Sequence, residues 1–564
     1  MHQQKQNEEY SAFVQEMFNF YSEIYPVLSM IKGLNLKKIQ PISYEDNLVV
    51  INRFKQYLQK LNTFKDEQLS ESQKNSKRLI LFLLNSKIDS FNHFWIQFPL
   101  SPYSGSEILN FNSFSEFQFR NENDLDDYLN LLDDLGKKLH DMLIFTKKQL
   151  EKDIFIPKPE LKLIIPMWKS FASPIEKNLL MVSETRLKSF NDVKVREFVN
   201  SCKNKIETVI LPRMNEIISF IQGDYWEQAP DTIGLWQYPG GKAAYLNLIK
   251  NNISYSWSPE EIHQLGLDEI DRLNHRIEAI MEKNGIEGDV NTIYRKITTD
   301  PQYSGQNPSK IKARLEAFLK EVQDKLIPRV FKKFPKTPGT IKRLPPNLEG
   351  SLTFGEYEPP LGGRNEGIYY YNASNVGAKE FLQIPAIALH ELYPGHHFQI
   401  SLTLENDNLD PFQKVPLDNS YLEGWAEYAS NLGYEFGVIS NPMDQIGGLF
   451  GLKMFAIRLV VDTGLNYFGW SLEKAKKFMK ENHFGDDSTI HTECLRYACD
   501  MPAQALAYRI GFLQIHKFRE TIKAQLEEKF DIKEFHEAVL EFGALPLSIL
   551  EEHLKEKLLG QIIL

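Results

Sequence analysis

Cysteine is scarce in this chain, and its three cysteines do not form the framework of a disulfide-rich protein. Cys202 stands alone, while Cys494 and Cys499 share one segment of helical periodicity. Their spacing does not match the paired cysteines of a structural zinc site. We therefore interpret all three as small buried residues, and we expect a fold that depends on its hydrophobic core.

Long apolar stretches are also missing. No uninterrupted run approaches the ~20 apolar residues that cross a bilayer as a helix. The N-terminal residues Met1–Glu9 lack the basic start and apolar core of a secretory signal. We expect no membrane span and a cytoplasmic location, although removal of a signal peptide would leave the same sequence and would allow secretion.

Strong charge of one sign is absent as well. The net charge is −10 over 564 residues, which argues against nucleic acid as the main partner. Hydrophobic residues make up 42% of the chain and charged residues 25%, so the chain can bury a large core. There is no fixed-period repeat, and no feature indicates an oligomeric state.

Apolar residues recur at helical spacing through most of the chain, and they predict a mainly α fold. The expected helical segments are 8–31, 46–63, 68–98, 121–154, 160–225 and 308–332, with breaks at 101–114 and 170–174. Turn residues cluster between Gly223 and Gly241, so we predict an N-terminal helical lobe (1–225) and a catalytic lobe (226–564) around a deep cleft. Prolines and glycines punctuate the aromatic stretch 344–372, which predicts a small sheet beside the metal-binding helix.

The stretch Pro385–Gln399 carries three histidines and a carboxylate. Pro385 predicts the start of a helix that would present His390 and Glu391. Zinc hydrolases place two histidines four residues apart on one helical face, with a glutamate beside the first as general base. Here Pro394 takes the fourth position, so the helix should end or bulge near Pro394–Gly395.

Two neighbouring histidines compete for the role of second ligand. On a straight helix His397 would share the face of His390 but lie about 10.5 Å further along, and His396 would point away. A two-residue bulge would bring His396 to His390, whereas a tight turn would favour His397. We predict His396 and keep His397 as the alternative. A polar helix end with capping histidines fits this otherwise apolar segment less well.

The third ligand is expected in the segment Asn419–Ala429. Ser420 and Glu423 match a capping box, in which Glu423 only closes the start of a helix. However, the run from Glu423 through Gly, Trp and Ala resembles the glutamate-bearing helix of gluzincin peptidases such as the zinc aminopeptidases, where this glutamate is the third ligand. Glu427, one turn later, is the fallback ligand or a partner that orients one.

The chain resembles the bacterial domain of unknown function family 885, which is similar to gluzincin-type metallopeptidases. The resemblance covers about residues 230–515 and rests on five blocks: Gly234–Lys242 with Tyr245; Glu260–Glu269; His390–Gln399; Glu423–Ala426; and Arg458–Leu465, followed by Arg496, Tyr497 and Gln504–Tyr508. It implies a zinc-dependent peptidase that acts on short peptides, with one Zn²⁺ per chain and Glu391 as general base. The alternative is an inactive peptide-binding or scaffold protein that keeps this fold.

Late in the chain, polar residues at helical spacing suggest substrate contacts. A tyrosine hydroxyl can donate to the oxyanion that forms during hydrolysis, and we expect Tyr497 first and Tyr508 second in this role. Arg458 or Arg496 can hold a substrate carboxylate, although Arg458 can also pair with Asp462 on its own helix.

Two further features leave alternatives open. A strand before the metal helix, with Tyr370 and Asn372, can pair its free edge with an extended peptide, or its tyrosines can simply pack one face of a hairpin. Asn466 stands where the family usually has histidine. Either that position is dispensable, or asparagine shares its role as a neutral hydrogen-bonding group.

Overall fold

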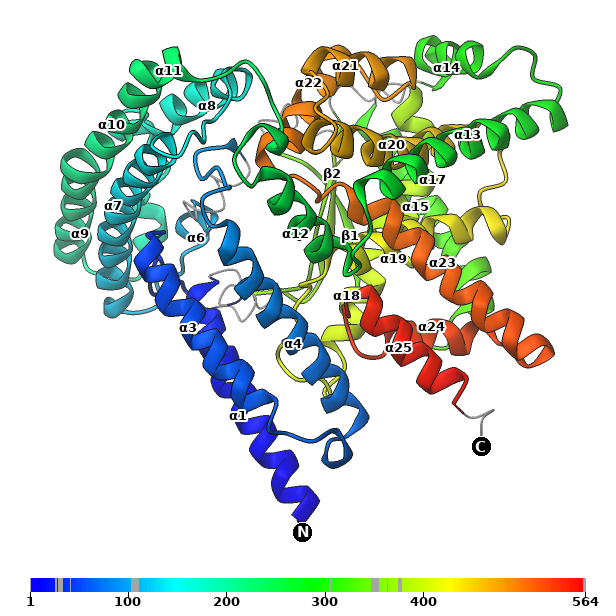
Figure 1. The fold of residues 1–564 in the computed structure, drawn as a ribbon, viewed down its shortest axis with the longest axis horizontal. Coiled ribbons are helices and arrows are strands. Elements are labelled where there is room, and N and C mark those ends of the chain that lie inside the picture. The colour runs from blue at the N-terminus through cyan, green and yellow to red at the C-terminus, as the bar shows by residue number, and fades with distance from the viewer. Residues whose placement is uncertain are drawn as a thin grey trace.

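The computed structural model describes residues 2–560 except 26–27, 29–33, 41, 103–110, 304–306, 346–354, 363 and 374–377. The described chain is mainly α-helical with one small three-stranded sheet, as Figure 1 shows. This confirms the predicted fold class. The division into lobes at residue 225 stays a prediction.

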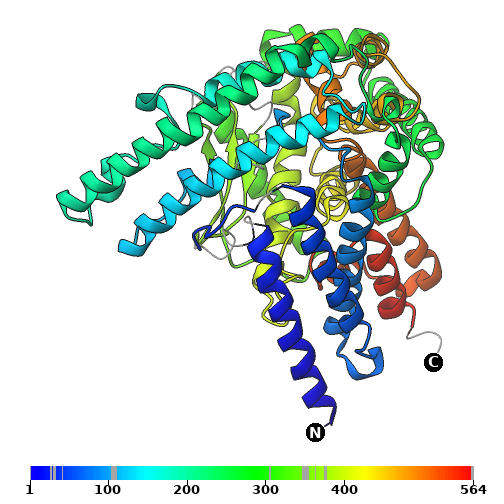
Figure 2. The same ribbon diagram turned by 60° about the vertical axis from the view of Figure 1, so that its left-hand side comes forward.

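The helices in the first part of the chain are α1 (His2–Ile24), α3 (Tyr44–Leu61), α4 (Glu71–Ser90), α6 (Phe111–Ser115), α7 (Glu122–Leu150), α8 (Lys158–Phe171), α9 (Asp192–Lys205), α10 (Leu211–Gln222) and α11 (Asp224–Gln228). The long helices lie mostly within the segments that periodicity predicted, whereas the five-residue α6 begins inside the predicted break at 101–114. The predicted break at 101–114 lies largely outside the described residues. In Figure 2, α1 to α4 (blue) and α7 to α10 (cyan to green) extend from the remaining helices in different directions.

The rest of the chain is also helical apart from the sheet. Its helices are α12 (Gly241–Ile253), α13 (Pro259–Lys283), α14 (Val290–Thr299), α15 (Pro308–Glu321), α16 (Ile327–Val330), α17 (Ala378–Glu391), α18 (His396–Leu404), α19 (Asn419–Glu435), α20 (Pro442–Asn466), α21 (Leu472–Glu481), α22 (Asp487–Leu495), α23 (Leu506–Leu526), α24 (Ile532–Leu540) and α25 (Leu547–Leu558). No helix in the described residues is long and apolar enough to cross a membrane.

The sheet consists of β1 (Gly339–Arg343), β2 (Gly355–Glu358) and β3 (Gly367–Tyr371) in the order β1-β3-β2. β3 pairs with β1 in parallel and with β2 antiparallel. The predicted sheet at 344–372 therefore contains β2 and β3, while β1 begins before it. Because β3 is central, both of its edges are paired, and this strand just before α17 has no free edge for a peptide.

The hydrophobic core joins segments that are far apart in the sequence. Side chains of α1, α3 and α4 pack with those of α15 to α19 and α23 to α25, for example Phe18 against Phe412 at 5.1 Å between ring centroids. A second cluster contains α7 to α12, and a third contains α13, α14 and α20 to α22. Cys202, Cys494 and Cys499 are buried and free, as predicted.

Glycines set how closely the helices around the candidate site approach one another. Gly424 of α19 faces Gly511 of α23, where an added Cβ on Gly424 would lie 2.4 Å from the Gly511 carbonyl carbon. Gly266 of α13 similarly faces α20, since its Cβ would lie 3.0 Å from the Ala456 carbonyl oxygen. Backbone-to-backbone packing therefore holds α19 and α20 in place.

A buried histidine links α24 to α19. His536 is fully buried, with Nδ1 2.8 Å from the Val330 carbonyl oxygen and Nε2 2.8 Å from the Tyr428 hydroxyl. The carbonyl can only accept, so Nδ1 carries the proton and Nε2 accepts from Tyr428. Burial lowers the pKa of His536 to about 3, and the neutral ring satisfies both contacts.

Candidate metal centre

Helix α17 delivers the first histidine and the neighbouring glutamate. It begins at Ala378, so Pro385 lies inside the helix, and the prediction that Pro385 starts it is wrong. A proline inside a helix lacks its own backbone donor and crowds the carbonyl four residues earlier, yet α17 continues through Pro385. The helix ends at Glu391, before Pro394, as the proline predicted.

A short turn then returns the chain toward the end of α17. Helix α18 begins at His396, directly after Gly395. A Cβ on Gly395 would lie 1.8 Å from the His390 carbonyl oxygen, closer than any side chain allows. Glycine therefore permits the close turn that brings His396 beside His390, with 4.8 Å between the two ring centroids.

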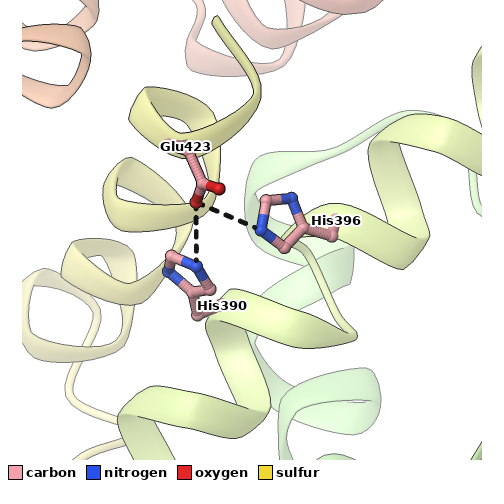
Figure 3. Close-up of side chains that lie close together, drawn as sticks. All are labelled: His390, His396 and Glu423. Carbon is pink, nitrogen blue, oxygen red and sulfur yellow. Dashed lines mark ion pairs between the residues drawn. The ribbon is translucent and has the colours of Figure 1, made fainter. Parts of the chain in front are cut away.

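His390, His396 and Glu423 converge from α17, α18 and α19, as Figure 3 shows. One carboxylate oxygen of Glu423, Oε2, lies 3.5 Å from His390 Nε2 and 3.4 Å from His396 Nε2. The ligand atoms of these three residues all lie within 4.8 Å of one another. Among the residues that the structure describes, these three form the one group of histidine, cysteine or acidic side chains close enough together to hold a metal ion.

Burial and mutual contact perturb the protonation of these groups. Burial opposes ionisation of Glu423, but hydrogen bonds from His390 and His396 outweigh it and lower the pKa of that carboxyl. The Glu423 carboxylate in turn raises the pKa of His396 against the effect of burial. Burial raises the pKa of Glu391, with a smaller contribution from Glu423. Glu391 thus holds a proton more readily than an ordinary glutamate.

His397, the alternative ligand, points away from the cluster. Its Nε2 lies 3.0 Å from the Thr337 carbonyl oxygen and its Nδ1 lies 2.8 Å from the Tyr357 hydroxyl. Both ring nitrogens are therefore engaged in hydrogen bonds that join α18 to the sheet. Burial lowers the pKa of His397 to about 4.

Glu423 does not close the start of its helix. The N-cap of α19 is Asp418, whose side chain accepts from the Tyr421 amide at 2.8 Å and from the Ser420 hydroxyl at 2.7 Å. The capping-box interpretation of Ser420 and Glu423 is therefore wrong, because the preceding aspartate takes that role. The Glu423 carboxylate is left free to face the histidines.

Glu427, the fallback ligand, belongs to a separate ion-pair network. Its Oε1 accepts from Arg509 of α23, whose Nε donates to Glu269 of α13 at 2.9 Å. Arg509 is 0% exposed and Glu427 1% exposed. This network locks α19 between α13 and α23 one turn after Glu423.

The cluster opens into a cavity of about 640 Å³. Its described lining residues all fall between Gly355 and Tyr508, so it lies within the predicted catalytic lobe rather than between that lobe and residues 1–225. Helices α17, α19 and α20 supply most of the wall, and β2 supplies an edge with Gly355, Glu356 and Tyr357. Glu391 lines this cavity beside the histidines.

A family model described as bacterial protein of unknown function (DUF885) matches residues 30–554. The chain belongs to the DUF885 family. No curated protein matches it. Two solved structures share its fold, and both are described with the words "putative lipoprotein". One, from Colwellia psychrerythraea, has a TM-score of 0.88 at 24% identity, covering 98% of this chain and 99% of the other. The other, from Shewanella oneidensis, has a TM-score of 0.72 at 16% identity, covering 96% and 99%.

The two candidate tyrosines of this DUF885 protein lie in different surroundings. Tyr508 lines the cavity, and its ring stacks on Phe455 with 4.9 Å between centroids. Tyr497 is fully buried and does not line the cavity; its hydroxyl donates to Glu493 and accepts from Arg458 Nε at 2.8 Å. Of the two, the structure brings only Tyr508 to the site.

Of the other residues predicted to contact a substrate, some line the cavity and some do not. Arg458 and Arg496 both line the cavity. Tyr370 and Asn372 are not among its lining residues, whereas Tyr357 of the edge strand β2 is. The sequence prediction included β2 in the sheet but missed its place at the cavity, because strand order depends on non-local pairing; Tyr357 is the single aromatic residue in β2 and was the available signal.

Asn466, at the position where the family resemblance led us to expect histidine, does not line the cavity. Its side chain is fully buried, accepts from the Leu235 amide at 3.1 Å and donates to the Tyr497 carbonyl oxygen at 2.9 Å. It also donates to the Asp462 carbonyl oxygen at 3.1 Å. Asn466 therefore joins the end of α20 to two neighbouring segments and has no contact with the space a substrate would occupy.

Proposed function

We propose that this chain is a metal-dependent peptidase that hydrolyses short peptides, with one zinc ion per chain held by His390, His396 and Glu423. The observation that carries the proposal is the convergence of these three ligand atoms at the wall of a cavity that also contains Glu391. Two imidazole nitrogens and one carboxylate oxygen, without thiolates, are the donor set of catalytic zinc sites. The resemblance of the Glu423 block to gluzincin peptidases supports the same assignment.

A bound zinc ion supplies a Lewis acid that activates water and polarises the scissile carbonyl. Glu391 accepts the proton of the attacking water and delivers it to the leaving nitrogen. The carbon–nitrogen bond breaks, the acyl carbon gains the hydroxyl group, and the amine leaves protonated. The raised pKa of Glu391 suits a group that must both take and return a proton.

In this proposal, other residues at the cavity orient the substrate. Tyr508 lines the cavity, and in this proposal its hydroxyl donates a hydrogen bond to the oxyanion that develops on the carbonyl. Strand β2 is an edge strand at the cavity, so its backbone can pair with an extended peptide. A cavity of about 640 Å³ is of the size that encloses a small ligand, which favours short peptides over folded proteins.

The test is cleavage of a mixed peptide library by protein purified without chelator. We expect zinc near one equivalent, turnover that a chelator abolishes and zinc restores, and loss of turnover by several orders of magnitude in Glu391→Gln with metal content unchanged. Metal retained with no cleavage of any peptide would support the alternative of a peptide-binding or scaffold protein. Metal lost in Glu391→Gln would make that residue a ligand rather than the base.

The cellular location of the protein is a separate question from its activity. The two structural neighbours described as lipoproteins favour export over the cytoplasmic location expected from the sequence. Fractionation of the native host with an antibody against the chain distinguishes the two, because an exported protein would leave the cytoplasmic fraction.

A further inference from the structure

The cavity at the metal cluster continues between the helices as an inner recess. On α17 its lining runs from His390 back to Gln383, and on α19 it runs from Glu423 on to Ser430. Seven residues of helix rise by about 10.5 Å, so the recess extends about two turns from the ligands on each helix. Gln383 and Ser430 are only 4% and 3% exposed, which places this end of the cavity inside the protein.

Helix α20 leaves room at this end because two of its glycines line the cavity. An added Cβ on Gly451 would lie 3.6 Å from Gln383 Nε2, and one on Gly448 would lie 3.4 Å from the Ala386 Cβ. A larger side chain at Gly451 would therefore crowd the Gln383 amide. Glycine leaves that amide facing the recess.

Gln383 is a buried polar side chain whose amide forms no hydrogen bond with any residue that the structure describes. A glutamine amide offers two N–H donors and one carbonyl acceptor. Leaving these groups buried and unpaired costs free energy, and buried polar groups in folded proteins are nearly always hydrogen-bonded. The recess therefore favours a ligand that presents both an acceptor and a donor to Gln383.

The carboxylate that lines the recess is already paired, so the recess offers hydrogen bonds rather than a net charge. Glu427 Oε1 accepts from Arg509, and Ser430 Oγ donates to the Ala386 carbonyl oxygen at 2.8 Å. A neutral group suits these surroundings better than an ammonium or a carboxylate, because a buried charge needs an opposite charge. The peptide backbone is such a group, since each amide unit presents one N–H and one C=O.

We propose that Gln383 binds a backbone amide of the substrate about three residues from the scissile bond. An extended peptide advances roughly 3.3–3.6 Å per residue, so three residues cover the distance of about 10.5 Å between His390 and Gln383 along α17. The proposal rests on the peptidase function proposed above, and it adds a subsite that favours peptides long enough to reach it. A side-chain amide of the substrate has the same chemistry and is separated in the experiment.

The experiment replaces single backbone amides of a peptide by esters, which removes one N–H donor at a time. Calorimetry measures binding to zinc-loaded Glu391→Gln protein, so that cleavage does not interfere. We expect one position, about three residues from the bond that the wild-type enzyme cleaves, at which the amide binds about 3- to 10-fold more tightly than the ester. In the double variant Glu391→Gln/Gln383→Met this ratio should fall to about one.

Two results of this scan would overturn the proposal. The first is a scan in which no ester position depends on Gln383. The second concerns the side-chain alternative, for which the scanned peptide contains no asparagine or glutamine. A Gln383-dependent effect that appears only after one of these residues is introduced would assign the recess to a substrate side chain.

A stability measurement and a matched variant separate binding from a structural role. Methionine keeps the unbranched shape of glutamine without its amide, so Gln383→Met should resist urea at least as well as the wild type. Gln399→Met is the control: Gln399 is 2% exposed on the neighbouring α18, is not among the described cavity residues, and donates from Nε2 to Thr403 at 3.1 Å. It should keep the ester effect. A marked loss of stability in Gln383→Met, or loss of the ester effect in Gln399→Met as well, would give Gln383 a structural role instead.

The subsite and the proposed function can fail separately. A Gln383-dependent ester effect supports the subsite even if no peptide is cleaved, in which case only the proposed function fails. Cleavage of peptides whose ester effect is unchanged in Gln383→Met would reject the subsite alone. Absence of any peptide binding and cleavage would reject both.

Discussion

The two adjacent histidines of α18 should respond in opposite ways to the same substitution. His396→Phe and His397→Phe each keep a ring of similar size and remove the ring nitrogens. His396 contributes its Nε2 to the cluster with Glu423, whereas both nitrogens of His397 bind structural partners. We therefore expect His396→Phe to lose metal and His397→Phe to lose stability.

The magnitudes follow from these contacts. Losing a residue that only orients a ligand weakens metal binding by about 10- to 100-fold, so losing a ligand should weaken it by more than about 100-fold. His397→Phe should stay within about tenfold of the wild-type metal affinity. It removes the hydrogen bonds to Thr337 and Tyr357, each with a net value of about 0.5–1.5 kcal/mol, so the free energy of unfolding should fall by about 1–3 kcal/mol.

Two measurements separate the variants. Competition with a chromophoric chelator gives the zinc affinity, and urea unfolding in excess chelator gives the stability of the metal-free proteins. Loss of metal in His397→Phe with metal retained in His396→Phe would show that the ligand assignment is reversed. Loss of metal in neither variant would refute a metal centre at this position.

Two other predictions test the helices around the site. Glu423→Gln should lose zinc. Glu427→Gln should keep zinc but lower the free energy of unfolding by about 1.5–3 kcal/mol, because Arg509 loses one of its two carboxylate partners. Chelator competition and urea unfolding measure the two effects, and the reverse pattern would place the ligand one turn later. His536, with a folded pKa of about 3 against 6.5 in the unfolded chain, stabilises the fold fully above pH 6.5 and loses that contribution as the pH falls toward 3. Between pH 7 and pH 5 this residue should lower the free energy of unfolding by about 2 kcal/mol. In His536→Phe the free energy of unfolding should therefore fall by correspondingly less over the same pH range. The same pH dependence in the variant and the wild type would contradict a neutral, buried ring.

Periodicity and capping patterns were sufficient to predict most of the local structure. The segments predicted at 46–63 and 121–154 appear as α3 and α7. Local rules work here because each depends on residues within one or two turns. The same rules correctly predicted a break near Pro394 but wrongly predicted that Pro385 starts α17, because Pro385 lies inside that helix.

The choice between His396 and His397 could be stated from the sequence but not decided by it. The choice depends on the path of the turn at Gly395, which is set by its contact with the His390 carbonyl. Tyr497 and Tyr508 presented the same difficulty, since both sit at helical spacing. Which of them reaches the cavity depends on the packing of α20 and α22 around Tyr497.

Strand order was likewise beyond the sequence pattern. The aromatic run of β3 resembles a strand that borders the site, yet β3 is paired on both sides and β2 forms the edge at the cavity. Pairing between strands separated by a loop depends on the surfaces that cover them. A pattern of alternating residues indicates that a strand exists and cannot show which neighbour it takes.

The three proposed ligands come from three helices, and residues without side chains fix the distances between those helices. Gly395 lets the chain turn back against the His390 carbonyl of α17, and Gly424 lets α19 touch α23 at Gly511. The buried Arg509 then pairs with Glu427, one turn beyond Glu423, so that α19 can neither slide nor rotate without separating a buried ion pair. Hydrophobic periodicity indicates which side chains are buried, but it does not show where a glycine allows two backbones to meet. The candidate ligands could therefore be named from the sequence, whereas the packing that brings them together could not.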